Sequence, residues 1–342
     1  MKICVIGAGA IGGLLGARLA QAGHEVSLIA RGAHLAALRA DGLRLRSNKE
    51  SLSLRVNASD SVAGFGPQDA VFIALKAYSI ADMLPRLAPL MGPQTMVIPA
   101  INGIPWWYFY KEGGRFDGER IDCLDPGAAM LRSLDSGRIL GCVVHASAEV
   151  VEPGVIEHTA GRRFILGEPD GSLSERAERM AAALEAAGLD APLSQRIRDD
   201  IWTKLVGNLA FNPVCALTAA RMDEAMNNPA IVELTRTVMS EGMRVGEAYG
   251  ARFAITIEER LHMAQRIGSA KVSMLQDLER GRPIESDAIV GAVCEFARRA
   301  GVPTPATDLI CTLIRQRGMS AARARSAVAG TAAGLRPANE VI

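Results

Sequence analysis

The chain has 342 residues, of which 49% are hydrophobic, and its 38 basic and 37 acidic residues give a formal net charge of +1. This length allows two domains with sizeable cores, and the charge balance excludes a global attraction to nucleic acid or to an anionic membrane surface. Six scattered cysteines without a C-x-x-C pair, and five histidines without metal-ligand spacing, predict reduced thiols and no bound metal. With neither a signal peptide nor an apolar run long enough to span a bilayer, we expect a cytoplasmic protein.

The first predicted elements are a strand, a turn and a helix at the start of the chain. Ile3–Ile6 is an uninterrupted apolar run, typical of a buried parallel strand. Gly7, Gly9 and Gly12 follow with G-x-G-x-x-G spacing, then an Ala- and Leu-rich helical segment and a second apolar strand over 24–29. Between a strand and a helix, this spacing indicates dinucleotide binding rather than an ordinary tight turn.

Each glycine has a separate role in such a turn. Gly7 permits the tight turn, Gly9 lets the backbone approach a pyrophosphate, and Gly12 lets the helix pack against the strand. The helix N-terminus offers N–H groups and the positive end of its dipole to the phosphates. The residues expected to hold the pyrophosphate are Gly7, Ala8, Gly9, Ala10, Ile11 and Gly12.

The end of the second strand indicates which dinucleotide binds. NAD sites usually place an acidic residue there for the ribose 2′-hydroxyl, whereas NADP sites lack the acid and supply an arginine for the 2′-phosphate. This chain has Ala30–Arg31 at that point, and no acidic residue lies between Val26 and Ala40. Arg31 could also be a solvated loop charge, but the pattern favours NADPH/NADP+.

Further alternating elements follow in the N-terminal half. The patterns predict helices over 33–40 and 79–90, an edge hairpin over 43–46 and 52–56, and core strands over 70–75 and 95–100. Lys76 and Asn102 follow the two core strands at their carboxyl ends, where open α/β sheets bind ligands. The aromatic run 106–110 is equally consistent with a pocket wall and with plain packing.

The character of the chain changes near residue 194. Strands over 138–150 and 155–166, a helix over 174–187 and a last short strand or extended link over 189–193 precede this point. Only helical patterns follow, over 197–220, 229–249, 257–278, 286–300 and 305–318. We therefore expect an α/β dinucleotide-binding domain over 1–193, an all-α helical domain over 194–318, and a frayed or flexible tail over 319–342.

The most informative helix carries a polar stripe. Apolar residues surround nearly its whole circumference, yet Lys204, Asn208 and Asn212 recur at every fourth position, and Pro213 should kink or end the helix. Burial of a lysine is costly and lowers its pKa, which suits a proton donor near neutral pH. A lysine whose amine reaches water is the alternative. The two asparagines at the same spacing favour a functional stripe.

A second cluster of polar residues begins near the end of the third predicted helix of this domain. Ser273 to Asp277 reads Ser-Met-Leu-Gln-Asp, and Glu285 and Asp287 come after a Gly-Arg-Pro break. A carboxylate in the first turn of a helix is favoured by the helix dipole. On spacing alone, Glu285 is equally consistent with a helix cap and with a site residue.

These residues together resemble the ketopantoate reductase family (2-dehydropantoate 2-reductases), from the start of the chain to about Gly318. The motifs that carry the resemblance are the glycine turn, Leu75-Lys76-Ala77, Asn102-Gly103, the Trp202–Pro213 helix, and Ser-Met-Leu-Gln-Asp followed by Glu285-x-Asp287. The lysine helix and the Ser-Met-Leu-Gln-Asp motif are the most distinctive of them.

The resemblance implies an N-terminal Rossmann-type domain that binds NADPH and a helical domain that covers it. Lys204 would be the general acid that protonates the ketone oxygen, and Glu285 would bind a substrate hydroxyl and hold the lysine. The other implied site residues are Asn208, Asn212 and Ser273 on the substrate's oxygens, Asn102 between nicotinamide and substrate, Lys76 near the cofactor, and Arg31 on the 2′-phosphate.

The implied activity is NADPH-dependent reduction of a 2-oxo acid to a 2-hydroxy acid, with ketopantoate to pantoate, a step of pantothenate biosynthesis, as the leading reaction. The bulky continuation Ile104–Tyr108, together with Ser286 and Met222, departs from the family pattern and makes a larger or more apolar 2-oxo acid a further candidate substrate. The alternatives are a non-catalytic NADP(H)-sensing protein and an opine-type or 6-phosphogluconate-type dehydrogenase. Helical domains of this kind often dimerise, but no heptad seam is visible, so a homodimer is left open.

Overall fold

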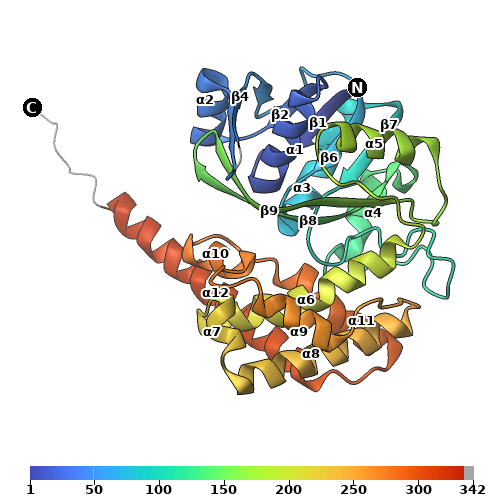
Figure 1. Cartoon of the computed structure of the whole chain (residues 1–342), viewed down its shortest axis with the longest axis vertical. Helices are drawn as coiled ribbons and strands as arrows, with labels where there is room; N and C mark the ends of the chain where they lie inside the picture. The colour runs from blue at the N-terminus through green and yellow to red at the C-terminus, as the bar shows by residue number, and fades with distance from the viewer. Residues whose placement is uncertain (49, 335–342) are drawn as a thin grey trace, which may run out of the picture. The chain divides into compact units, whose positions relative to one another are not determined.

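The computed structural model describes residues 1–48 and 50–334, with side chains through residue 325. The chain divides into two compact units, Met1–Ile201 and a second that begins at Trp202 (Figure 1). The division falls inside helix α6 (Ile197–Thr218), slightly after the predicted position at residue 194. A parallel α/β sheet in the first unit and helices in the second confirm the predicted fold class.

The core of the first unit is a five-stranded parallel sheet with the strand order β5-β2-β1-β6-β7. Its strands are β1 (Lys2–Ile6), β2 (Glu25–Ile29), β5 (Asn57–Ser59), β6 (Gln68–Ile73) and β7 (Met91–Pro99). Residues Ile3–Ile6 and 70–73 are fully buried, as expected for parallel strands that are covered on both faces. The predicted strands at 3–6, 24–29, 70–75 and 95–100 are thus confirmed.

Helices connect these strands. The first unit contains α1 (Ala10–Gln21), α2 (Gly32–Asp41), η1 (Ala77–Ser79), α3 (Ile80–Met83), η2 (Leu84–Leu90), η3 (Pro126–Ala128), α4 (Ala129–Ser133), η4 (Ser136–Arg138) and α5 (Glu175–Ala186). The prediction of one continuous helix over 79–90 was wrong, because this stretch consists of short 3-10 and α turns. Pro85 and Pro89 lack the N–H groups that a continuous α-helix would need.

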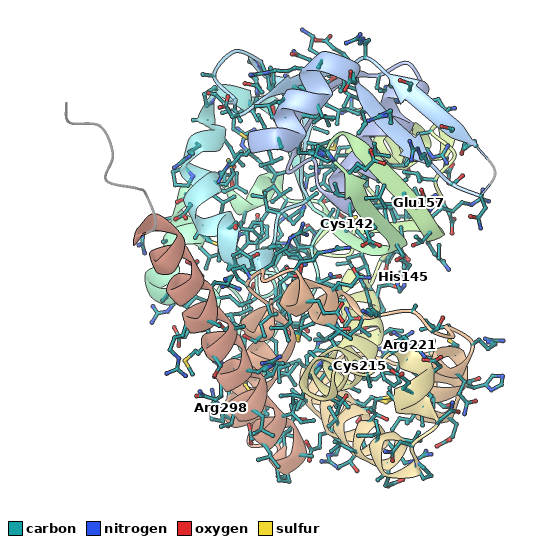
Figure 2. All side chains as sticks on the ribbon, turned by 90° about the vertical axis from the view of Figure 1, so that its left-hand side faces the viewer. Cys142, His145, Glu157, Cys215, Arg221 and Arg298 are labelled. Carbon is teal, nitrogen blue, oxygen red and sulfur yellow. The ribbon has the colours of Figure 1, made fainter. Side chains whose placement is uncertain are left out.

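A second, four-stranded sheet has the order β4-β3-β9-β8. Its strands are β3 (Leu43–Arg46), β4 (Ser51–Leu54), β8 (Gly141–Glu152) and β9 (Val155–Gly167). The predicted hairpin forms, but β3 pairs in parallel with β9, so the hairpin extends this sheet and not the edge of the first one. Figure 2 labels Cys142, His145 and Glu157 on the antiparallel β8–β9 pair.

The second unit is built from helices. Its elements are α6, α7 (Met222–Met226), α8 (Pro229–Ala248), α9 (Ile257–Gln265), α10 (Ser273–Glu279), the π-helical turn η5 (Asp287–Gly291), α11 (Ala292–Ala300) and α12 (Pro305–Gly334). The predicted single helix over 257–278 was wrong, because the chain breaks around Gly268, which has a φ of +71°. Helix α7 was not predicted from the sequence. Its first N–H groups donate hydrogen bonds to carbonyl oxygens of this break, Met222 to Ala270 and Asp223 to Gly268.

Two further helices bear on where predicted elements end. α6 continues through Pro213 to Thr218, which agrees with the helix predicted over 197–220; of the kink or end expected at Pro213, the end does not occur. Nearly all sides of α6 are buried, and tertiary packing can hold a helix together beyond a residue that interrupts its hydrogen bonds. α12 continues past Gly318 to Gly334, so a helix occupies most of the predicted tail. The remainder of that tail, 335–342, lies outside the described residues.

A buried carboxylate fixes the start of α12. Glu241 of α8 is only 3% exposed, and it accepts hydrogen bonds from the backbone N–H groups of Ala306 (3.1 Å) and Thr307 (2.8 Å) and from the Thr307 hydroxyl (2.7 Å). Helix N-termini favour negative charge and leave N–H groups to be satisfied. Glu241 therefore joins α8 to α12 within the helical unit.

Candidate active site

The parallel register brings four predicted cofactor-binding segments to one edge of the first sheet. Ile6 of β1 lies opposite Ile29 of β2 and Ile73 of β6, and Ile73 lies opposite Pro99 of β7. Each strand is followed within a few residues by a predicted site segment, and these are the glycine turn, Arg31, Lys76 and Asn102. This is the carboxyl edge, on both sides of the central strand β1, where open α/β sheets bind their ligands.

The glycine turn has the backbone geometry that its spacing predicts. Gly7 has a φ of +96°, which favours glycine, and a Cβ at Gly12 would lie 2.0 Å from the carbonyl oxygen of Gly7. A Cβ at Gly9, by contrast, would have no atom of the described residues within 4 Å. The backbone of Gly9 therefore faces open space, which is what the approach of a pyrophosphate requires.

Helix α1 begins directly at this turn. Its N-cap is Gly9, no side chain caps it, and its first turn contains no acidic residue. The first intrahelical hydrogen bond runs from the Gly13 N–H to the Gly9 carbonyl, so the N–H groups of the preceding turn are not used inside the helix. This end of α1 can therefore accept an anion.

The turn is tied to the end of strand β2. The N–H groups of Gly7 and Ala8 both donate to the Ile29 carbonyl oxygen, at 3.1 Å and 2.8 Å. Arg31, two residues further on, is the exposed N-cap of α2. An exposed arginine two residues after the strand end that holds the glycine turn, without a carboxylate in the stretch 26–40, is the arrangement that suits a 2′-phosphate.

Lys76 and Asn102 are half-buried at the same edge, after β6 and β7. The aromatic run that follows is packed into the first unit: Trp106, Trp107, Tyr108 and Phe109 are at most 2% exposed. Arg198 binds this segment by donating to the carbonyl oxygens of Tyr108 (2.8 Å) and Tyr110 (2.7 Å). Burial lowers the pKa of Arg198. Of the two interpretations left open by the sequence, the structure favours packing for these residues.

The helical unit carries the second predicted group of residues. Lys204, Asn208 and Asn212 lie on one face of α6, with Lys204 and Asn208 half-buried and Asn212 only 5% exposed. The neighbouring faces are buried, as predicted, and include Trp202, whose ring lies 6.1 Å from that of Phe296. The thiol of Cys215, labelled in Figure 2, lies further along the same helix and is also buried.

The carboxylates of Glu285 and Asp287 lie in different environments. Ser273 is the first residue of α10, and Gly281, with a φ of +62°, breaks the chain before Glu285. Asp287 is exposed and forms an ion pair with Arg315 at 2.6 Å. Glu285 is only 6% exposed and lies two residues before the π-helical turn η5, whose N-cap is Ser286. Burial of its carboxylate distinguishes Glu285 from an exposed cap, and π-helical turns often lie at functional sites.

No helix within 1–48 or 50–334 is long and apolar enough to cross a membrane. In the same part of the chain, no three His, Cys, Asp or Glu side chains come together in an arrangement that could hold a metal ion.

The sheet order, the glycine turn and the following helical unit define the class of two-domain, dinucleotide-binding oxidoreductases. Family models agree with this assignment. Residues 3–107 match the model described as "Ketopantoate reductase PanE/ApbA", and residues 196–318 match "Ketopantoate reductase PanE/ApbA C terminal". The chain belongs to the ketopantoate reductase family, as the sequence motifs predict.

Individual relatives are similar over nearly the whole chain. A 2-dehydropantoate 2-reductase of Mesorhizobium japonicum is 46% identical, over 92% of this chain and 97% of the relative. A crystal structure of a candidate ketopantoate reductase from Ralstonia solanacearum has a TM-score of 0.89 at 41% identity and covers 93% of this chain and 98% of its own. A 2-dehydropantoate 2-reductase structure from Geobacter metallireducens has a TM-score of 0.82 at 27% identity, with 92% and 99% covered.

Proposed function

We propose that the protein reduces a 2-oxo acid to a 2-hydroxy acid with NADPH, and that ketopantoate is its substrate. The observation that carries the proposal is the polar stripe of Lys204, Asn208 and Asn212 on a helix whose other faces are buried. A protein that only senses NADP(H) needs the glycine turn but has no use for this stripe. The family and the relative from Mesorhizobium japonicum support the choice of substrate.

The residues at the sheet edge fit NADPH. The turn at Gly7–Gly12 offers uncapped helix N–H groups and open space at Gly9, where the pyrophosphate would lie. Arg31 would hold the 2′-phosphate, and Lys76 and Asn102 would lie on the nicotinamide side of the site. When bound, NADPH supplies the hydride that reduces the carbonyl carbon.

The helical unit would contribute the acid and the substrate contacts. As the ketone is reduced, negative charge develops on its oxygen, and the Lys204 ammonium would stabilise this charge and donate a proton to the oxygen. Asn208, Asn212 and Ser273 would orient the substrate through hydrogen bonds, and Glu285 would bind a substrate hydroxyl and hold Lys204. The contribution of these side chains is mainly to position the reacting groups.

The test is NADPH oxidation with ketopantoate and with a panel of larger branched and aromatic 2-oxo acids, repeated with NADH. Turnover of ketopantoate above the other acids would support the proposal. Turnover only in the presence of an amine, or with decarboxylation, would indicate an opine-type or 6-phosphogluconate-type dehydrogenase. NADPH binding without reduction of any member would refute the proposal in favour of a sensor.

A further inference from the structure

A half-buried arginine lies against the lysine helix within the helical unit. Arg260 belongs to α9, and its guanidinium covers Gly207 of α6. A Cβ at Gly207 would lie 2.3 Å from Nη2 and 2.6 Å from Nε of Arg260. The absence of a side chain at Gly207 therefore lets the guanidinium lie directly on the helix backbone.

The Arg260 guanidinium lacks partners of the kind that hold the half-buried Arg176 and Arg198. Among the described residues, no acceptor forms a hydrogen bond or an ion pair with it, and burial lowers its pKa. Arg176, in contrast, forms two 2.6 Å hydrogen bonds with the Glu168 carboxylate, and Arg198 is held by three backbone carbonyls. The partial burial of this cation is not compensated by an acceptor of the protein and is therefore unfavourable, which suggests that the guanidinium binds an anion from outside the chain.

Arg260 lies over a helix position that neighbours Lys204, the proposed proton donor. Gly207 is three residues from Lys204, and positions spaced in this way are neighbours on a helix surface, with Cβ positions about 5–6 Å apart. In a 2-oxo acid the carboxylate is bonded directly to the carbonyl carbon, so the groups that bind its keto oxygen and its carboxylate must also be neighbours. A planar guanidinium matches a carboxylate through two parallel hydrogen bonds.

We propose that Arg260 binds the carboxylate of the 2-oxo acid and thereby selects acids over neutral ketones. This inference rests on the proposed function, because it assumes that Lys204 acts on the keto oxygen of the same molecule. Gly207 then serves specificity, since it leaves room for the guanidinium beside the acid. The sequence did not reveal Arg260, because an arginine within a charged helical segment reads as a solvated residue.

The test compares two substrates of nearly equal size, ketopantoate and its primary amide, in wild type and Arg260→Gln. Loss of the charged hydrogen bonds should lower kcat/KM for the acid by roughly 10- to 100-fold and leave kcat/KM for the amide nearly unchanged. Gly207→Ala provides a second variant, because its Cβ would displace the guanidinium while the arginine remains. It should reduce the preference for the acid in the same direction. Arg266→Gln removes an exposed charge at the end of the same α9 and should change neither value.

Several results would overturn the inference. Equal losses with the acid and the amide in Arg260→Gln would assign the residue a structural role. An unchanged acid preference in a variant with wild-type circular dichroism and NADPH affinity would exclude carboxylate binding. If wild type reduces no 2-oxo acid at all, the proposed function itself fails, whereas an active wild type with an unchanged preference in the variant refutes only the role of Arg260.

Discussion

Gly9 and Gly12 of the cofactor turn should respond differently to substitution by alanine, one through cofactor affinity and the other through stability. In Gly12→Ala the new methyl group would lie 2.0 Å from the Gly7 carbonyl oxygen, a backbone atom that cannot move aside alone. In Gly9→Ala the methyl group would point into space without protein atoms within 4 Å among the described residues, and the φ of −71° is open to alanine. The first variant should therefore lose stability, and the second should lose only cofactor affinity.

The expected magnitudes follow from these distances. Overpacking of this kind costs about 1–3 kcal/mol, and each kcal/mol lowers the melting temperature of a domain of 150–250 residues by roughly 2–4 °C. Gly12→Ala should thus melt about 2–12 °C below wild type without cofactor. Gly9→Ala should melt like wild type, but its methyl group would block the pyrophosphate. Loss of hydrogen bonds to a charged group, at about 1.5–3 kcal/mol, corresponds to a roughly 10- to 150-fold higher Kd for NADPH.

The assay combines thermal melting of the cofactor-free protein with a fluorescence titration of NADPH. Gly64→Ala is the matched control, because it also places a methyl group in open space without a positive φ, but in a turn outside the glycine motif. It should match wild type in both measurements. A Gly9→Ala variant that melts as low as Gly12→Ala, or that binds NADPH as tightly as wild type, would refute the reasoning.

Three further predictions concern the acid, the cofactor preference and the helical unit. Lys204→Ala should lower kcat by about 10²- to 10⁴-fold, the usual contribution of a positioned acid, without changing the NADPH Kd; a large loss of cofactor affinity would contradict the assigned role. Arg31→Gln should lower the NADPH-over-NADH ratio of kcat/KM by roughly 10- to 100-fold, while Arg39→Gln on the same helix should leave the ratio unchanged. Glu241→Gln should cost about 1–3 kcal/mol in a denaturant titration, whereas Glu247→Gln, at an exposed position of the same helix, should be neutral; equal effects would show that the buried cap is not stabilising.

The parts of the fold that sequence predicted well depend on local signals. The first sheet could be predicted from its apolar strands, from the glycine turn and from the alternation of strand and helix patterns. Parallel strands that are buried on both faces read as continuous apolar runs. The polar stripe on α6 could be recognised because polar residues recur at every fourth position of an otherwise apolar helix.

The wrong predictions concern features that local pattern does not determine. Pairing of β3 with β9 joins Leu45 to Ile156, and nothing in the alternation of 43–46 identifies a partner so distant in sequence. The pattern correctly predicted one helix over 197–220 but left open a kink or an end at Pro213, and burial on nearly all sides lets α6 continue through that residue. The break around Gly268 is stabilised by hydrogen bonds with α7, a helix that is too short to show a period.

In the candidate site, too, residues within local motifs were predictable and residues defined by tertiary contacts were not. Residues that belong to a motif, such as the glycines and Lys204, could be named from their order in the chain. Arg260 could not, because its significance depends on contact with Gly207, which lies on another helix. The burial that separates Glu285 from the ion-paired Asp287 is likewise a property of the folded chain.

The two hydrogen bonds from the glycine turn to the Ile29 carbonyl oxygen have a consequence for how the cofactor preference can evolve. They use only backbone atoms, so the shape of the phosphate-binding turn does not depend on which side chain follows the second strand. Position 31 is exposed and caps α2 without a side-chain hydrogen bond, so its substitution should cost little stability. Selection could therefore exchange one dinucleotide for the other at the rim of the site, while the inherited turn stays as it is.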